Sequence, residues 1–263
     1  FIEVPESTEL AARLAEAGFT EYPHHAGRLF EHHGGLFPLI VLSDQAPLQV
    51  GLKVDWVADF LAAWMIGADT IVEGEPMAPL RRACVDRQAD TRLWVVERHG
   101  CRHFETVDRR PDHAVLALHH LESFRRRDRD RPTEAEGFEH TLALIDAAIA
   151  DVGLDDACDL FFHAEREYWQ RHNRAAQIQK ARQDRFGLGW ANHDHHTYRS
   201  SRRHFRSLIE VLERLGFVCR EAFYAGHEAG WGAQVLEQPA CRFVIFADVD
   251  MAAEEISGDF AHE

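Results

Sequence analysis

The stretch WANHDHHTYRS, residues 190–200, decides the fold, because it opens a region whose element order can be read without a gap. We expect a strand over 190–199, followed by a helix N-cap at the serine pair 200–201. A helix is predicted over 202–215, where apolar side chains recur three and four residues apart, and Gly216 ends it. Three more strands are expected in FVCREAFY (217–224), GWGAQVLE (230–237) and RFVIFADVD (242–250). The predicted order is therefore β-α-β-β-β.

The N-terminal part of the chain repeats this order. A strand, a helix and three short strands are predicted in FIEV, STELAARLAEAG, TEYPHH, GRLFEHH and FPLIVLSD, all within residues 1–44. The segment LAEAGF (14–19) parallels LERLGF (212–217), and Glu31 falls opposite Glu237. A third unit is expected between 47 and 109, ending in a hairpin formed by 92–100 and 101–108. A fixed order that recurs along a chain is typical of a duplicated structural unit.

Residues 133–186 follow a different pattern. Thr133 and Glu136 predict a capping box and a helix that Gly153 stops. A longer helix is expected over 156–185, whereas HAVLALHHLESF (113–124) looks like a strand. We therefore expect an α+β protein divided in three. Residues 1–110 would hold β-α-β-β-β units, with room for two. Residues 111–188 would form a helical insertion or linker, and 189–263 the C-terminal unit with the metal site.

Composition limits the classes of function. The formal net charge of −15 disfavours nucleic acid as a partner, since phosphate binding needs a basic surface. No apolar run reaches the length of a membrane span, and no signal peptide is visible. The 5 cysteines are scattered, which fits a reducing cytoplasm. Because residue 1 is Phe rather than Met, we expect further residues before it.

Histidine is unusually frequent, with 18 residues, and the opening strand concentrates it. Strand side chains alternate between faces. His193, His195, Thr197 and Arg199 would share one face, while residues 194, 196 and 198 share the other. Such a row suits a cavity holding a metal and an anionic ligand, because imidazole is a neutral metal ligand and guanidinium forms bidentate hydrogen bonds to carboxylates. The alternative is an exposed polar face of an antiparallel sheet.

Tandem β-α-β-β-β units with a histidine on the first strand and a later glutamate resemble the vicinal oxygen chelate superfamily. The segment Asp194–Arg199 is similar to its D-H-x-T-x-R first strand. The resemblance implies that paired units curl into a cup-shaped, mostly antiparallel sheet around a divalent metal. It also implies that His195 is a metal ligand and that His193 is a spare ligand or an acid/base. Thr197 and Arg199 complete the predicted catalytic row.

A narrower resemblance is to the 2-oxoadipate dioxygenase/decarboxylase family, an iron-dependent branch with longer chains. It rests on residues 195–199, on the pair Glu237-Gln238 and on Glu97-Arg98-His99-Gly100. Here the sequence departs from the family pattern at Arg102 and His103, because the expected arginine stands one residue early. The resemblance implies Glu237 and His99 as further metal ligands.

Other ligands stay open from the sequence alone. Asp248 is the second choice for the carboxylate, after Glu237. The third ligand could also be one of six other histidines: His24, His25, His32, His33, His119 and His120.

Two histidines and one carboxylate leave three positions open on an octahedral metal, which suits Fe(II) and oxygen chemistry. We therefore expect a cytoplasmic, metal-dependent enzyme, a non-haem Fe(II) dioxygenase acting on a small 2-oxo or 2-hydroxy acid that Arg199 binds. Zn, Ni and Mn are the other candidate metals. A ligand set that includes Glu31 would favour a glyoxalase-like Zn or Ni isomerase or lyase.

The rival class is a metal-free binding or resistance protein of the same fold. Its cup would be lined with aromatic side chains, for which the sequence offers Trp190, Tyr198, Tyr224 and Trp231. Either class allows a homodimer. The metal content of protein purified without a histidine tag distinguishes the two.

Overall fold

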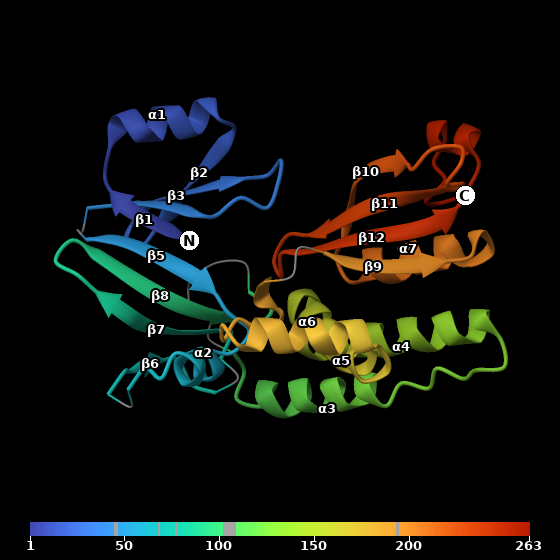
Figure 1. The fold of residues 1–263 in the computed structure, drawn as a ribbon, viewed down its shortest axis with the longest axis horizontal. Helices are drawn as coiled ribbons and strands as arrows, with labels where there is room; N and C mark the ends of the chain where they lie inside the picture. Colours follow the sequence, from blue (N-terminus) through green and yellow to red (C-terminus); the bar gives the residue numbers. More distant parts are fainter. Residues whose placement is uncertain (45–46, 68, 77, 102–108, 193–194) are drawn as a thin grey trace. The chain divides into compact units, whose positions relative to one another are not determined.

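The computed structural model describes residues 1–44, 47–67, 69–76, 78–101, 109–192 and 195–263 (Figure 1). It is an α+β protein, with 7 α-helices and two mixed sheets of 8 and 4 strands among these residues. The chain divides into two compact units. Unit 1 comprises Phe1–Arg98 and Gln179–Asn192, and unit 2 comprises His99–Ile178 and His193–Glu263. The predicted division at 110 and 188 follows secondary structure rather than compactness, and it stays a prediction.

Unit 1 is built on the larger sheet. Its strands are β1 (Ile2–Pro5), β2 (Phe19–His24), β3 (Gly27–His32), β4 (Ile40–Ser43), β5 (Leu48–Lys53), β6 (Val72–Glu73), β7 (Leu80–Arg87) and β8 (Thr91–Arg98). They lie in the order β2-β3-β4-β1-β5-β8-β7-β6. Helix α1 (Thr8–Glu16) follows β1, and α2 (Val57–Ala63) follows β5. In each half the first strand pairs in parallel with the last, β1 with β4 and β5 with β8. Antiparallel pairing of β1 with β5 joins the halves.

Helix α1 shows why the sequence forms these elements. The Ser7 hydroxyl accepts a hydrogen bond from Leu10 N at 3.2 Å, which satisfies one of the free N–H groups of the first turn. Ala11 and Leu14 are three residues apart and therefore lie on one face of the helix; both are buried and pack against Phe30 and Leu42 of the sheet. The helix is thus fixed by a cap and by an apolar stripe.

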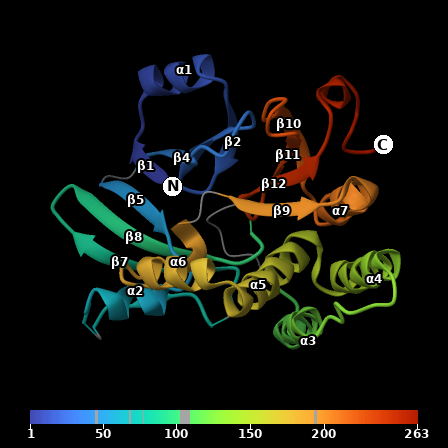
Figure 2. The ribbon, with the colours of Figure 1, turned by 45° about the vertical axis from the view of Figure 1, so that its right-hand side comes forward.

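Unit 2 carries the smaller sheet and most of the helices (Figure 2). Its strands are β9 (His196–Ser200), β10 (Val218–Tyr224), β11 (Trp231–Gln238) and β12 (Phe243–Asp250), in the order β10-β11-β12-β9. Its helices are α3 (His113–Arg125), α4 (Glu134–Val152), α5 (Leu154–His172) and α7 (Arg202–Arg214). Helix α6 (Arg174–Asp184) crosses the boundary between the units, and 3-10 helices span Gly189–Asn192 and Ala253–Ser257.

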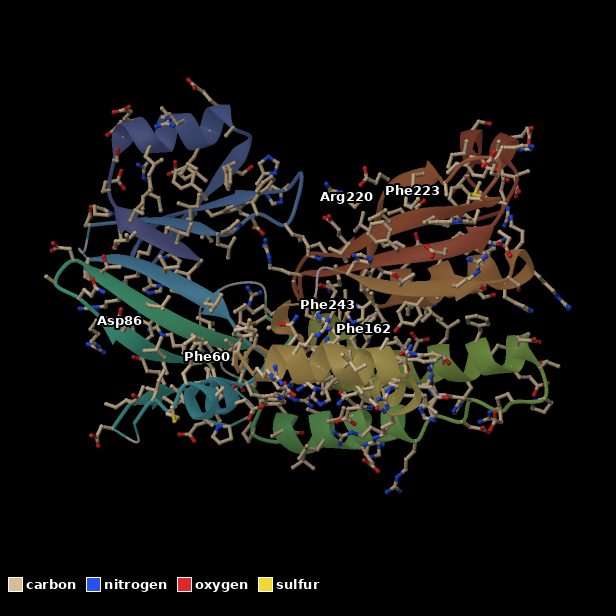
Figure 3. The ribbon with its side chains drawn as sticks, viewed as in Figure 1. Phe60, Asp86, Phe162, Arg220, Phe223 and Phe243 are labelled. Carbon is tan, nitrogen blue, oxygen red and sulfur yellow. The ribbon has the colours of Figure 1, made fainter. Side chains whose placement is uncertain are left out.

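The core of unit 2 lies between the sheet and its helices. Buried residues of α3, α4, α5 and α7 pack with residues of β11 and β12 in one cluster. Figure 3 shows Phe162 of α5 beside Phe243 of β12, and their ring centroids are 5.3 Å apart. One face of the four-stranded sheet is therefore covered by helices. The other face carries the candidate site.

Three elements differ from the sequence-based expectations. Residues 113–125 form helix α3 rather than a strand, because the buried positions 113, 117, 120, 121 and 124 follow helical spacing. The long helix expected over 156–185 is two helices, since Asn173 ends α5 and its side chain accepts from Ala175 N at 2.8 Å. Strand β9 begins at His196 rather than at 190.

The hairpin expected from 92–100 and 101–108 is also different. Strand β8 pairs antiparallel with β7, a strand not predicted, and parallel with β5. Residues 102–108 lie outside the described part of the chain. Among the described helices, none combines the length and the apolar run needed to cross a membrane.

Candidate functional site

The side chains around β9 alternate as a strand requires. His195, Thr197 and Arg199 are exposed, whereas His196 and Tyr198 are partly buried. The ring of His196 lies 5.2 Å from that of Phe162 on α5, so residues 196 and 198 face the helices. His195, Thr197 and Arg199 therefore point to the opposite side. His193 lies outside the described residues, and its predicted role stays a prediction.

Strand register identifies what else lies on that side. Thr197 pairs with Phe246, and Phe246 pairs with Val235, so the three share one face. Glu237 is two residues from Val235 and therefore on the same face. We call this side, carrying His195, Thr197, Arg199, Phe246 and Glu237, the site face.

His195 and Glu237 lie on one row across the site face. Glu237 is in register with Val244. The pairing of His196 with Ile245, extended by one residue, sets His195 beside the same Val244. The two α-carbons are thus about 10 Å apart, two strand spacings of about 4.8 Å each. The structure brings these two predicted ligands to the same end of one sheet.

Three aromatic rings lie together on the site face. The ring of Phe246 lies 4.5 Å from that of His195 and 5.9 Å from that of Phe223 on β10. Trp231 lies 5.6 Å from Phe223. Of the aromatic lining expected for a binding protein, Trp231 is on this face. Tyr198 and Tyr224 instead pack against the helix-covered core.

Charged groups border the aromatic rings. Arg199 forms an exposed ion pair with Asp250. Asp248 is in register with Arg199, and partial burial raises the pKa of its carboxyl group, while Arg199 and His195 act in the opposite direction. Arg220, next to a β-bulge in β10, lies 3.3 Å from Glu237, whose side chain is 18% exposed. The site face therefore offers two guanidinium groups, and each already faces a carboxylate.

His99 lies in a different cluster of polar side chains. Its Nδ1 is 3.2 Å from Asp159 on α5, and its backbone carbonyl accepts from Arg109 at 3.0 Å. Arg109 also donates to Asp156 at 2.6 Å. Burial raises the pKa of Asp156 to about 7 despite this contact. The structure thus gives His99 a carboxylate partner of its own.

The three predicted metal ligands are not assembled together. Within the described ranges, one group of three or more His, Cys, Asp or Glu side chains has all its ligand atoms within 4.8 Å of one another, and it consists of Glu213, Cys219 and His262. His195, Glu237 and His99 do not form such a group. Their assignment to one metal stays a prediction.

The alternative ligands are placed as follows. Glu31 is buried on β3 of unit 1. His120 is buried on α3 and lies 2.7 Å from Asp151. His24 and His25 have ring centroids 4.2 Å apart at the turn between β2 and β3. His32 lies edge-on to Phe19 and Phe37, and His33 contacts Tyr22. His119 is exposed on α3.

Sequence reasoning missed Phe223 on the site face and a separate cluster of polar side chains. Alternation along β10 could have placed Phe223 on the site face, but the β-bulge between Cys219 and Glu221 shifts the register and hides that signal. The cluster of Glu213, Cys219 and His262 had no sequence signal, because its members are separated by up to 49 residues.

Comparison with known proteins adds no family. No family model matches the chain, and neither the curated proteins nor the solved structures give a match. The function is therefore argued from the residues and geometry above.

Proposed function

We propose that the protein is a metal-dependent enzyme of the vicinal oxygen chelate type, with its metal on the site face of unit 2. The observation that carries this proposal is the shared row of His195 and Glu237. The element order supports it, because β1 to β4, β5 to β8 and β9 to β12 each run strand, helix, three strands. In all three the first strand pairs in parallel with the last. We propose that these three segments are copies of one structural unit, of the kind whose sheets curl into a cup.

The donors suit a divalent metal. Imidazole and carboxylate are the usual ligands of non-haem iron and of zinc. Two extended side chains on α-carbons about 10 Å apart can converge on one ion, given metal–ligand bonds of about 2 Å. The Glu237 carboxylate has Arg220 as its present cationic partner. A metal would take over that role and leave the guanidinium for another anion.

The third protein ligand remains a proposal. His99 is the candidate that the resemblance implies. Because its partner Asp159 belongs to α5, which covers the opposite face of the sheet, His99 would have to leave Asp159 to reach a metal on the site face. His193, two residues before His195, is the alternative, either as a ligand or as an acid/base.

We propose a small 2-oxo or 2-hydroxy acid as the substrate. Arg199 and Arg220 are the groups on the site face that would bind a carboxylate. The substrate carboxylate would compete with Asp250 for Arg199, and Thr197 would offer a hydroxyl beside it. The rings of Phe246, Phe223 and Trp231 would hold its carbon chain.

The chemistry depends on which metal is bound. Two histidines and one carboxylate would suit Fe(II), which would supply oxygen chemistry, so a dioxygenase is the lead proposal. Zn, Ni or Mn at the same residues would favour an isomerase or lyase, because these reactions need no oxygen. Oxygen consumption during turnover separates the two reactions.

A second candidate is a metal-free binding protein. The aromatic rings of Phe223, Trp231 and Phe246 favour it, since apolar surfaces bordered by a few charges are typical of small-molecule sites. The contact of the His195 ring with Phe246 would then be part of an aromatic binding surface, and His195 would bind no metal.

The first prediction tests the metal. Protein purified without a histidine tag is loaded anaerobically with Fe(II), and bound metal is measured by mass spectrometry. His195→Ala should lose one equivalent of metal with an unchanged circular dichroism spectrum, and Glu237→Gln should bind the metal at least 10-fold more weakly. His227→Ala, which removes an exposed histidine of the β10–β11 turn, should behave as the wild type. Equal metal content in all four proteins would leave the metal-free binding protein as the better description.

A further inference from the structure

The last turn of α7, the start of β10 and the C-terminal residues converge at one place in unit 2. Glu213 belongs to α7, Cys219 to β10, and His262 to the C-terminal turn. Their ligand atoms all lie within 4.8 Å of one another. His262 Nε2 is 2.9 Å from Glu213 Oε1, and Cys219 Sγ is 4.0 Å from the same oxygen. A nitrogen, a sulfur and an oxygen donor therefore meet around one point.

Packing holds these groups in place. Phe260, which is 2% exposed, stacks on Phe205 of α7 with ring centroids 5.7 Å apart. Ala261 is buried beside it, and Arg202 pairs with Glu255 at 2.7 Å. The residues around His262 are thus anchored to α7. Cys219 is in register with Leu236 of the buried core, so its side chain points to the helix side of the sheet, away from the site face.

We propose that Glu213, Cys219 and His262 form a second metal site, suited to Zn(II), that is separate from the site face. Thiolate, imidazole and carboxylate are the three ligand types that zinc takes in proteins. With three protein ligands the fourth tetrahedral position is left to water, as in zinc sites that keep an open position.

The distances fit a tetrahedral ion. Zinc bonds of about 2.1 Å to nitrogen and oxygen and about 2.3 Å to sulfur separate the ligands by about 3.4 Å (N to O) and about 3.6 Å (S to O). The observed separations are 2.9 Å and 4.0 Å. These two pairs would have to move by about half an ångström. The sulfur and the nitrogen, which lie within 4.8 Å of each other, would have to come to about 3.6 Å.

A fourth residue supports the histidine. Asp259 Oδ1 lies 2.7 Å from His262 Nδ1, on the side of the ring away from Glu213 and Cys219. A carboxylate that accepts from the second ring nitrogen fixes the tautomer and the orientation of a metal-bound histidine. An ion pair between a protonated His262 and two carboxylates would account for Asp259 and Glu213, but not for the thiol beside them.

Cobalt(II) is the probe for this site, because a thiolate ligand gives a near-ultraviolet charge-transfer band that nitrogen and oxygen ligands do not. The candidate ligands of the site face, His195, Glu237 and His99, contain no sulfur, so the band distinguishes the proposed cysteine site from the site face. The full chain titrated with Co(II) should show the band together with the visible absorption of a tetrahedral ion. Zn(II) should displace Co(II) and slow the alkylation of Cys219.

Variants test whether Co(II) binds at these three residues or elsewhere in the chain. Cys219→Ser and His262→Gln should abolish the band, and Asp259→Asn should weaken Co(II) binding by about 10–100-fold. His195→Ala should keep the band, as should Cys84→Ser, which removes a partly exposed cysteine of unit 1. A missing band in the wild type, or a band that survives Cys219→Ser, would overturn the site. Loss of iron at the site face with retention of the band would show that the two sites are independent.

Discussion

Glu165 of α5 is 3% exposed and holds two arginines at once. Its Oε1 lies 2.8 Å from Arg127 and 2.5 Å from Arg129, and its Oε2 accepts from Trp169 at 3.3 Å. Arg127 is itself well buried, and burial lowers the pKa of its guanidinium. Removing one partner of a buried ion pair leaves an uncompensated charge in a medium that solvates it poorly.

We therefore expect Glu165→Ala to lower the free energy of unfolding by about 3–5 kcal/mol, measured by urea denaturation. Glu167→Ala is the matched control on the same helix. Glu167 pairs with Arg125 at 2.7 Å, but both side chains are partly exposed, and such a pair contributes about 0–1 kcal/mol. Similar losses in the two variants would show that burial does not set the strength of these pairs.

Single residues of the candidate site were predictable where the alternation of side chains along one strand determines which face each one lies on. The pattern of residues 195–199 correctly predicted which side chains share one face of β9, since alternation depends on the backbone period alone. The pairing of Arg199 with Asp250 was not predictable, because the two are 51 residues apart and meet only through the sheet register. The contact between Glu237 and Arg220 depends in the same way on a bulge in β10.

At the scale of elements, helix caps and the spacing of apolar residues determine where the sequence predicts helices and strands correctly. Of the capping box predicted at the start of α4, the N-cap bond is present, because Thr133 Oγ1 accepts from Glu136 N at 3.2 Å. The Glu136 carboxylate accepts from the Thr133 hydroxyl at 3.2 Å rather than from the Thr133 backbone N–H. Strand-like composition misled at 113–125, where helical spacing of the buried positions was the better guide. The break between α5 and α6 needed Asn173 to be read as a cap within a charged run.

The cap of α4 can be tested directly. Thr133→Ala removes the acceptor of one free N–H at the helix start and should lower the free energy of unfolding by about 1 kcal/mol in urea denaturation. Thr133→Ser keeps the hydroxyl and should stay within a few tenths of the wild type. A loss of the same size in both variants would point to the threonine methyl group rather than the hydrogen bond.

At the scale of the whole molecule, the sequence predicted the α+β class and the strand-rich ends of the chain. It did not predict the two compact units, because each is made of two separate segments. Residues 99–178 join 193–263 through contacts such as Phe162 with Phe217 and Gln238 with Asp155. No local sequence pattern predicts such contacts, because the residues are far apart in the chain. The boundary at 98 falls directly after β8, where Gly100 stands without the run of Gly, Pro and Ser residues that would mark a linker.

The net charge gives a whole-molecule test of the proposed acidic substrate. A formal charge of −15 repels an anion at long range, whereas Arg199 and Arg220 attract it only near the site face. The screening length falls from about 30 Å at 0.01 M salt to about 8 Å at 0.15 M, so salt removes the long-range repulsion first. For a 2-oxo acid, kcat/KM should therefore rise by on the order of two- to tenfold over this range.

The neutral methyl ester of the same acid is the control, and its kcat/KM should not change. A kcat/KM that falls with salt for the acid would mean that the local arginines dominate even at long range, and equal behaviour of acid and ester would mean that the substrate carboxylate is not recognised through charge.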